Sequence, residues 1–360
     1  MLIRAWTQRL QNAPPELEDL DLDQPRAGEV LVRVVAAAVC HTDLFAPSLV
    51  ALPAVFGHEG SGIVDAVGPG VRKVRPGDRV VMTFGSCGAC RSCNASAPAY
   101  CEHSHELNME GRRLDGSLTL RGPEGPVRGA FFQQSSFATH SLATERNVVP
   151  VPDAFPLELA GPLGCGVQTG VGSIVNVLQP PAGSSVVIFG AGSVGLSAVM
   201  GAALTGCDPI VAVDVRSDRL ALARELGATH ALDARAGRIA ESVRDLTNGG
   251  ALYSVETAGT VQSFNDAIEC LARRGACALV TVPNLGQPFE FTPLPILRGR
   301  SLVGVLEGGS DPDRFIPWLM DLHLGGHLPF DRFCRRYRFD DLPLALADAT
   351  AGRAIKPIIC

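Results

Sequence analysis

The sequence predicts an α/β protein with a β-rich first part and a later part built on a doubly wound parallel sheet. Three observations support this prediction. Short β-branched stretches separated by Gly- and Pro-containing turns fill residues 28–40 and 61–82. After about residue 165, strand-like and helix-like segments alternate, which is typical of a parallel sheet covered by helices. The chain has 360 residues, which suffices for about two domains of ordinary size.

The strands of the first part are predicted from alternation and from turns. Residues 28–40 alternate β-branched with other side chains, as a half-buried strand does. Within residues 61–82, short strands are separated by turns at residues 68–70 and 76–78. Residues 104–130 are polar and rich in Gly, and we expect them to form a loop excursion.

The elements of the second part are predicted from short apolar runs that alternate with longer helical segments. The expected strands are residues 185–189, 210–213, 252–255 and 278–282. The expected helices are residues 193–205, 218–226 and 261–272. From about residue 307, we expect one more helical segment and a terminal strand at residues 354–359.

Composition and charge exclude several classes of protein. Hydrophobic residues make up 46% of the chain and charged residues 19%, so a disordered chain is excluded. The formal net charge of −6 lacks the basic footprint that binding to a nucleic-acid backbone requires. The N-terminus shows no signal-peptide pattern, and apolar stretches fall short of the ~20 residues that span a membrane. We therefore expect a cytoplasmic protein with neither a nucleic-acid nor a membrane partner.

The 11 cysteines indicate metal binding or burial rather than disulfides, because the cytoplasm keeps thiols reduced. Cys87, Cys90, Cys93 and Cys101 follow a C-x2-C-x2-C-x7-C spacing, which suits a closed tetrahedral shell around a structural zinc. An iron–sulfur cluster and spare thiols are the alternatives, although Glu102 stands where ferredoxin-type runs usually carry Pro. Five cysteines are scattered singly and are expected to be inert apolar residues: Cys207, Cys270, Cys277, Cys334 and Cys360.

A second set of metal-binding side chains is spread along the chain. Cys40, His58 and Cys165 offer two thiolates and an imidazole, the ligand set of a catalytic zinc with one open position. Asp43 is suited to orient His58 through a hydrogen bond. Taken singly, each cysteine or histidine is more often a packed core residue. The sequence alone does not show that the three segments meet.

A glycine motif indicates dinucleotide binding. Gly190-Ala191-Gly192-Ser193-Val194-Gly195 follows an expected strand and opens an expected helix, and Asp214 ends the next strand about 20 residues further on. Amides at Ser193 can bind the phosphates at the helix N-terminus. Asp214 can bind both hydroxyls of the adenosine ribose and repel a 2′-phosphate, which favours NAD over NADP, although Arg216 and Arg219 can weaken that repulsion. The alternative is a plain glycine turn with a capping Asp.

Along essentially its whole length, the chain resembles the zinc-dependent medium-chain alcohol dehydrogenases. The matching features are Cys40-His41-Thr42-Asp43, Gly57-His58-Glu59-Gly60, the four-cysteine lobe, Pro162-Leu163-Gly164-Cys165-Gly166 and the glycine motif. Within the family, it is most similar to the bacterial aryl- and terpenyl-alcohol dehydrogenases of the benzyl alcohol and geraniol types. The closest points are residues 131–140 and 157–170.

The resemblance implies a domain organisation. Residues 1–166 and 307–360 would form a GroES-like catalytic domain, with a structural zinc lobe at residues 85–102. Residues 167–306 would form an inserted Rossmann domain that binds NAD. Family members form dimers or tetramers, and the strand-like residues 301–305 are where two Rossmann sheets would join edge to edge.

The resemblance also implies roles at the metal. Cys40, His58 and Cys165 would bind the catalytic zinc, one of two zinc ions per subunit. Glu59 would lie behind the zinc and could exchange onto it. Thr42 would hydrogen-bond the substrate oxygen and begin the proton relay.

On the cofactor side, the resemblance implies that His41 and Lys356 face the pyrophosphate and that Arg219 approaches the adenosine ribose. The remaining cofactor residues would be Gly190, Gly192, Ser193, Val194, Gly195 and Asp214.

One position departs from many family members. Phe45 stands where the proton relay usually ends in a histidine, so the proton would leave through the nicotinamide ribose and His41, or through water. The benzyl-alcohol type also lacks that histidine. Phe84, Phe131 and Phe132 match positions that line the substrate channel in the family, and Phe45 would join them, although each can equally be a core residue.

The expected function is therefore interconversion of a primary aryl or allylic (terpenoid) alcohol and its aldehyde, with hydride transfer to or from NAD. The alternatives on the same scaffold are a thiol-adduct formaldehyde dehydrogenase or a dehydrogenase for another apolar alcohol. Outside these enzymes, the alternatives are a catalytically silent cofactor-binding protein and a nucleic-acid binder that uses the cysteine lobe. The acidic charge opposes the last, and the presence of all expected zinc ligands opposes the silent protein.

Overall fold

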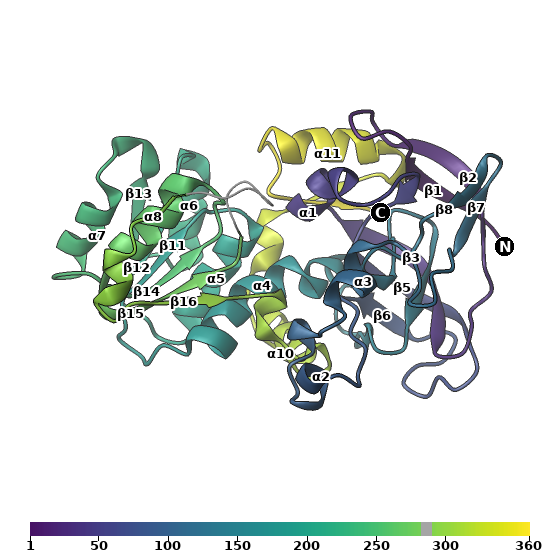
Figure 1. The fold of residues 1–360 in the computed structure, drawn as a ribbon, viewed down its shortest axis with the longest axis horizontal. Coiled ribbons are helices and arrows are strands. Elements are labelled where there is room, and N and C mark those ends of the chain that lie inside the picture. Colours follow the sequence, from purple (N-terminus) through teal and green to yellow (C-terminus); the bar gives the residue numbers. More distant parts are fainter. Residues whose placement is uncertain (282–289) are drawn as a thin grey trace. The chain divides into compact units, whose positions relative to one another are not determined.

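The computed structural model describes residues 1–281 and 290–360, which form two compact units (Figure 1). Unit 1 comprises Met1–Cys165 and Asp311–Cys360, and unit 2 comprises Gly166–Ser310. Both chain termini lie in unit 1, so unit 2 is an insertion in its sequence. None of the helices in the described ranges has the length and apolar character that a membrane crossing requires.

Unit 1 is built on two β-sheets. The first has the order β4-β1-β2-β7-β8 and the second the order β10-β6-β5-β3-β18-β17, with β9 also paired to β3. Their strands are β1 (Leu2–Gln8), β2 (Glu16–Leu22), β3 (Glu29–Ala38), β4 (Ala54–Val55), β5 (Glu59–Val67), β6 (Arg79–Met82), β7 (Leu120–Gly122), β8 (Gly125–Val127), β9 (His140–Thr144), β10 (Val148–Pro150), β17 (Cys334–Tyr337) and β18 (Lys356–Ile359). The α-helices of unit 1 are α1 (His41–Phe45), α2 (Arg91–Asn94), α3 (Ser104–Met109), α10 (Pro312–Leu324) and α11 (Leu342–Thr350).

Apolar side chains from both sheets of unit 1 form a shared core. Ile3 and Leu20 of the first sheet pack in one cluster with Leu31 and Leu142 of the second. All four are at most 5% exposed, so each contributes about 1.5–3 kcal/mol of burial free energy. Alternation of apolar and polar residues along these strands therefore directs one face of each sheet into the core.

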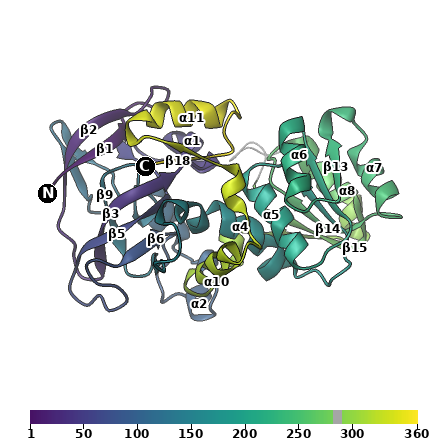
Figure 2. The same cartoon turned by 180° about the vertical axis from the view of Figure 1, so that it is seen from behind.

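Unit 2 has one parallel sheet with the order β13-β12-β11-β14-β15-β16. Its strands are β11 (Val186–Phe189), β12 (Ile210–Asp214), β13 (His230–Asp233), β14 (Ala251–Glu256), β15 (Leu271–Leu279) and β16 (Ser301–Gly304). Its α-helices are α4 (Gly166–Gly172), α5 (Ser193–Leu204), α6 (Ser217–Glu225), α7 (Ile239–Leu246), α8 (Val261–Glu269) and α9 (Leu294–Leu297). Figures 1 and 2, which view the molecule from opposite sides, show helices on both faces of the sheet. The central strand β11 is almost fully buried, as a strand covered on both faces must be.

The predicted order of elements is confirmed where the hydrophobic pattern is simple. β11, α5, β12 and α6 begin and end within one residue of the predicted bounds. The prediction is wrong for residues 104–130, which contain α3 and the paired strands β7 and β8. The hairpin was not predicted because its strands are only 3 residues long, too short to show alternation within a Gly-rich segment.

Three predictions in the later part are also wrong. The helix expected at residues 261–272 ends at Glu269, and β15 starts at Leu271 rather than residue 278. Arg274 has a φ of +66° and the pairing of β14 with β15 changes register there, so alternation is interrupted in the first half of β15. Residue 282 of the expected strand lies outside the described residues. After residue 307 there are two α-helices, α10 and α11, rather than one.

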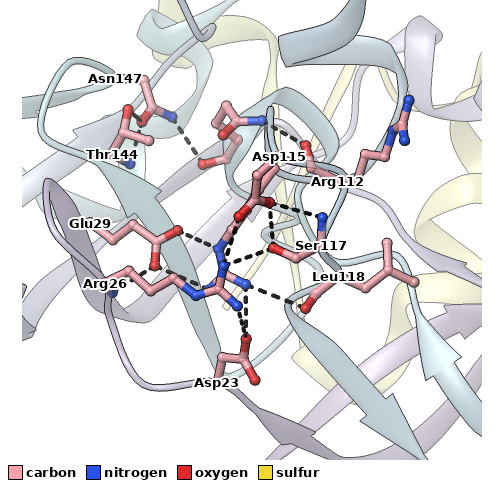
Figure 3. Close-up of polar contacts among 11 residues, drawn as sticks. Asp23, Arg26, Glu29, Arg112, Asp115, Ser117, Leu118, Thr144 and Asn147 are labelled. Atoms are coloured by element: carbon pink, nitrogen blue, oxygen red, sulfur yellow. Dashed lines mark hydrogen bonds and ion pairs between the residues drawn. The ribbon is translucent and has the colours of Figure 1, made fainter.

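A polar network joins the loop before β7 to the start of β3 (Figure 3). The guanidinium of Arg113 donates to Asp23 at 2.8 Å and to both carboxylate oxygens of Glu29. Arg26 donates to Asp115 at 3.1 Å and to Ser117 at 2.9 Å. Because Arg113 is 7% exposed, its charge-assisted bonds to Asp23 and Glu29 replace the hydrogen bonds to water that its side chain lost on burial. The network anchors a polar loop that has little apolar surface of its own.

Candidate active site

Four potential metal ligands converge in unit 1. The ligand atoms of Cys40, His58, Glu59 and Cys165 all lie within 4.8 Å of one another. His58 and Glu59 are fully buried, and the two cysteines are 9% exposed. The structure thus brings together the three segments that the sequence could not connect.

The pairing of β3 with β5 explains why two of these segments meet. The strands are antiparallel and Ala38 pairs with Glu59, so the residues after β3 lie beside those at the start of β5. Cys40 follows β3 directly and is the N-cap of α1. The register of one strand pair therefore places Cys40 near His58.

Asp43 connects these two segments. One of its carboxylate oxygens accepts the N–H of Cys40 at 2.9 Å. The other accepts the N–H of Gly57 at 3.2 Å and lies 2.9 Å from Nδ1 of His58. Asp43 is 4% exposed and therefore holds the imidazole by its Nδ1 side in a dry environment.

The other imidazole nitrogen has the environment that a metal requires. Nε2 of His58 is buried and has no hydrogen-bond partner among the described residues. A buried polar atom without a partner is costly unless a ligand satisfies it. Two cysteine sulfurs beside it complete a sulfur–nitrogen donor set that suits zinc. These residues therefore fit a zinc ion with room for a further ligand.

Glu59 is paired with Lys356. The ammonium of Lys356 donates to both carboxylate oxygens, at 2.8 and 2.9 Å, and its side chain is 1% exposed. Burial raises the pKa of Glu59 to about 6, although the Lys356 charge acts in the opposite direction. Burial lowers the pKa of Lys356, but the charges of Glu59 and Cys40 outweigh burial and hold that pKa above its ordinary value.

The resemblance implies that Lys356 faces the cofactor pyrophosphate, and this role stays a prediction. The structure directs the ammonium of Lys356 at Glu59. The physical reason is that a buried carboxylate without a counter-charge is strongly destabilising. No sequence signal indicates the pair, because the two residues are 297 positions apart.

The remaining residues of the α1 segment are more open. Thr42 is half-buried, and its Oγ1 lies 3.8 Å from Sγ of Cys40. His41 is exposed, and its ring lies 6.0 Å from that of Phe45. The structure therefore keeps Thr42 next to the metal ligands and leaves the imidazole of His41 accessible.

The four phenylalanines of the expected channel are not equivalent. Phe84 and Phe131 are 4% and 0% exposed, so they are interior residues. Phe131 packs edge-on against Phe56, at 5.1 Å between ring centroids. Phe132 is partly buried and stacks on the ring of His58, with centroids 4.5 Å apart. Phe132 and Phe45 are thus the two of the four that retain exposed surface near the metal ligands.

The four-cysteine lobe brings together a second group of potential metal ligands. The sulfurs of Cys87, Cys90, Cys93 and Cys101 lie within 4.8 Å of one another. Backbone N–H groups donate to several of them, including Cys87 N to Cys101 Sγ at 3.3 Å. The N–H groups of Cys93 and Glu102 lower the pKa of Cys90 to about 6. Such a sulfur cluster can hold one tetrahedral zinc ion.

The glycine motif of unit 2 lies between β11 and α5. Gly190 has a φ of +93°, which allows the turn that ends β11. A Cβ on Gly195 would lie 1.8 Å from the carbonyl oxygen of Gly190, so only glycine allows this close packing. A Cβ on Gly192 would meet no atom within 4 Å. Packing therefore does not require glycine at Gly192, where a bound phosphate could approach the backbone.

Asp214 lies beside this loop because β11 and β12 are parallel neighbours. Its carboxylate accepts the N–H of Ala191 at 2.6 Å and that of Arg216 at 2.9 Å. Nε of Arg219 is buried without a hydrogen-bond partner among the described residues. Thr257 was not predicted from the sequence; its hydroxyl donates to the carbonyls of Phe189 and Gly190 and so fixes the turn. A single threonine carries no motif that could have indicated this contact.

Two family models match separate parts of the chain. The family model described as an alcohol dehydrogenase GroES-like domain matches residues 26–153. The model described as a zinc-binding dehydrogenase matches residues 193–323. A geraniol dehydrogenase from Castellaniella defragrans is 45% identical over 361 residues, covering 99% of this chain and 97% of the relative.

Two solved structures have nearly the same fold as this chain. An alcohol dehydrogenase zinc-binding domain protein from Burkholderia ambifaria has a TM-score of 0.96 at 45% identity, covering 100% of this chain and 98% of its own. A benzyl alcohol dehydrogenase from Acinetobacter calcoaceticus has a TM-score of 0.95 at 40% identity, covering 100% and 99%. The predicted fold class, a GroES-like domain with an inserted Rossmann domain, is confirmed. The chain belongs to the zinc-dependent alcohol dehydrogenase family, whose members are oxidoreductases that use zinc and NAD(H).

Proposed function

We propose that the protein interconverts a primary aryl or allylic alcohol, such as a terpenoid alcohol, and its aldehyde, with NAD as the hydride acceptor or donor. The observation that carries this proposal is the buried cluster of Cys40, His58 and Cys165, in which Nε2 of His58 has no hydrogen-bond partner within residues 1–281 and 290–360. Geraniol and benzyl alcohol, which name the enzymes of two relatives, are allylic and aryl primary alcohols.

Cys40, His58 and Cys165 would hold a catalytic zinc, with Glu59 in reach of the same position. When bound, the zinc would act as a Lewis acid that polarises the alcohol oxygen. The four cysteines of the lobe, Cys87, Cys90, Cys93 and Cys101, would hold a second, structural zinc.

The chain's own residues would orient the ligands and move the proton. Asp43 holds the imidazole of His58 so that Nε2 remains available. Thr42 would accept the hydroxyl proton of the substrate and pass it on, with exposed His41 as a relay to water. Phe45 has no proton to relay, and with Phe132 it would provide apolar surface for the alcohol.

The cofactor would lie along the glycine motif of unit 2. The backbone at Gly192, Ser193 and Val194 would bind the pyrophosphate at the N-terminus of α5. Asp214 would bind the adenosine ribose and disfavour a 2′-phosphate, and Arg219 would donate to the same ribose. We therefore expect NAD to be preferred over NADP.

We assign the catalytic function to residues 1–166 and 307–360 and cofactor binding to residues 167–306. A homodimer or homotetramer would form through β16, which is the last strand of its sheet in the part of the chain that the structure describes. An edge strand presents unpaired backbone groups that a second copy can pair with. Its sequence carries no proline or charge that would block such pairing.

The test is reduction of NAD by the purified zinc-loaded protein with geraniol or benzyl alcohol. We expect turnover with both alcohols, and at least tenfold lower kcat/KM with NADP. Cys165→Ser should abolish turnover and lower the zinc content by one ion per chain. Cys207→Ser is the matched control, because Cys207 is also buried but lies in unit 2, hydrogen-bonded to Thr205. Turnover only with a hydroxymethyl-thiol adduct, or with neither alcohol despite full zinc content, would overturn the substrate assignment.

A further inference from the structure

An unusual backbone segment packs against the metal-binding loop. Phe132, Gln133 and Ser135 have φ values of +51°, +53° and +51°, a left-handed conformation that non-glycine residues rarely adopt. Such residues persist where surrounding contacts over-determine the backbone. Gln134 lies among them and is 0% exposed.

The side-chain amide of Gln134 satisfies main-chain groups around two potential metal ligands. Its Nε2 donates to the carbonyl of His58 at 2.8 Å. Its Oε1 accepts the N–H of Gly60 at 3.0 Å. The amide therefore hydrogen-bonds the backbone of the residues that precede and follow Glu59.

The same amide reaches a second strand. Nε2 of Gln134 also donates to the carbonyl of Thr83, at 3.2 Å. The hydroxyl of Thr83 donates in turn to the carbonyl of Gly164 at 2.7 Å, and Gly164 directly precedes Cys165. The glutamine amide thus donates twice through its NH₂ group and accepts once through its carbonyl oxygen.

These segments are in direct backbone contact, so displacement of one is transmitted to the next. A Cβ on Gly161 would lie 2.2 Å from the carbonyl oxygen of Glu59. A Cβ on Gly164 would lie 2.2 Å from the carbonyl oxygen of Met82. Little free space remains for a shift of the His58 or Cys165 backbone.

Gln134 complements Asp43. Asp43 ties the Cys40 backbone to the imidazole of His58. Gln134 ties the His58 backbone, through Thr83, to the segment of Cys165. Together the two buried side chains connect all three metal-binding segments.

We propose that Gln134 is a positioning residue for the catalytic metal. It sets the spacing of His58 and Cys165 by hydrogen bonds to the main chain, and it touches neither the metal nor the substrate. The inference rests on the proposed function in one respect, that these residues bind the catalytic zinc.

Gln134→Met tests this role, with Gln133→Met as the matched control. The substitution keeps side-chain length and removes the amide. Gln133 is 6% exposed, directly precedes Gln134 and also donates to two carbonyls, those of Leu107 and Arg112. A purely structural role predicts similar effects for the two variants.

Two measurements separate positioning from general stability. The first is the rate at which a chelator removes the catalytic metal from the folded protein. Each variant is measured at the same number of degrees below its own melting temperature. The second is the visible spectrum of the cobalt-substituted protein, because the d–d bands of a mixed sulfur–nitrogen site report ligand geometry and differ from those of a four-sulfur site. We expect Gln134→Met to release the metal about 10- to 100-fold faster and to shift the mixed-site bands. Gln133→Met should stay within about twofold with unchanged bands.

Thr83 provides an independent arm of the test. Thr83→Val removes the hydroxyl that reaches Gly164 and should accelerate metal release in the same direction as Gln134→Met. Thr83→Ser keeps the hydroxyl and should restore the wild-type rate. If Gln134→Met does not fold, Gln134→Glu and the Thr83 pair carry the test, since a carboxylate keeps the size but cannot make both donations.

Equal release rates for Gln134→Met and Gln133→Met, or unchanged cobalt bands in Gln134→Met, would overturn the proposal. So would a Thr83→Ser variant that releases metal as fast as Thr83→Val. Wild-type protein that binds metal only at the four-cysteine lobe would instead refute the proposed function. The two failures are therefore distinguishable.

Discussion

Asp43→Asn is the most direct test of how the chain prepares its metal site. The carboxylate of Asp43 serves three nitrogens, the backbone N–H of Cys40, the backbone N–H of Gly57 and Nδ1 of His58. Asparagine has the same shape but only one acceptor oxygen. Whichever way the amide turns, its NH₂ group faces an N–H donor.

The size of the effect follows from this count. The variant loses at least one hydrogen bond to an ionised carboxylate, which is worth about 1.5–3 kcal/mol. Since about 1.4 kcal/mol corresponds to a factor of ten, zinc should bind about 10- to 100-fold more weakly. If the amide instead donates to Nδ1 of His58, the proton moves to Nε2 and blocks coordination, which gives a loss at the upper end of this range.

Competition with a chromophoric chelator measures the zinc affinity, and kcat/KM is measured with and without added zinc. Asp65→Asn is the matched control, because Asp65 also faces a histidine, His140 at 3.2 Å, but lies within β5 rather than in α1. We expect Asp65→Asn to leave zinc affinity unchanged. Wild-type zinc affinity in Asp43→Asn would refute the argument that this carboxylate prepares His58 for the metal.

Three further predictions concern the cofactor loop, the buried ion pair and a tyrosine. Gly192→Ala should weaken NAD binding at least tenfold without lowering the melting temperature of the cofactor-free protein, whereas Gly195→Ala should lower it, as calorimetry would show. Lys356→Met should cost about 3–5 kcal/mol in urea unfolding by removing the counter-charge of the buried Glu59 carboxylate, and adding Glu59→Gln should recover part of that loss; no loss in the single variant would contradict the pairing. Burial and a hydrogen bond raise the pKa of Tyr337 from 10.0 to about 12, so its contribution to stability is complete below pH 10 and is lost between pH 10 and about 12. The unfolding free energy of the wild type should therefore fall relative to that of Tyr337→Phe across this window, and parallel curves would contradict the shift.

The sequence predicted most of the fold because its strands and helices have simple periodicity. Continuous apolar runs such as Val186–Phe189 are typical of strands buried on both faces, and α5 begins at the glycine motif. The hairpin of β7 and β8 escaped prediction because its strands are too short to show alternation. The start of β15 escaped because the irregular pairing at Arg274 breaks the alternation.

The site was predictable to the extent that its residues lie in local motifs. Cys40 and Asp43 are three positions apart, so a capping geometry alone brings the carboxylate back to the Cys40 N–H. Contacts of Glu59 with Lys356 and of Gln134 with His58 join residues 297 and 76 positions apart. No periodicity links such pairs, and the sequence therefore does not distinguish a structural glutamine from one that holds a metal ligand.

The buried ion pair also bears on how Glu59 could reach the metal. Its carboxylate lies among the metal ligands, yet Lys356 holds both of its oxygens. Moving the carboxylate onto a metal would break hydrogen bonds that have no water to replace them, since both side chains are at most 1% exposed. The ammonium thus favours a resting position of the Glu59 carboxylate behind the three proposed ligands Cys40, His58 and Cys165. Replacing Lys356 with a neutral residue would remove this restraint, so it should draw Glu59 toward the metal as well as destabilise the fold.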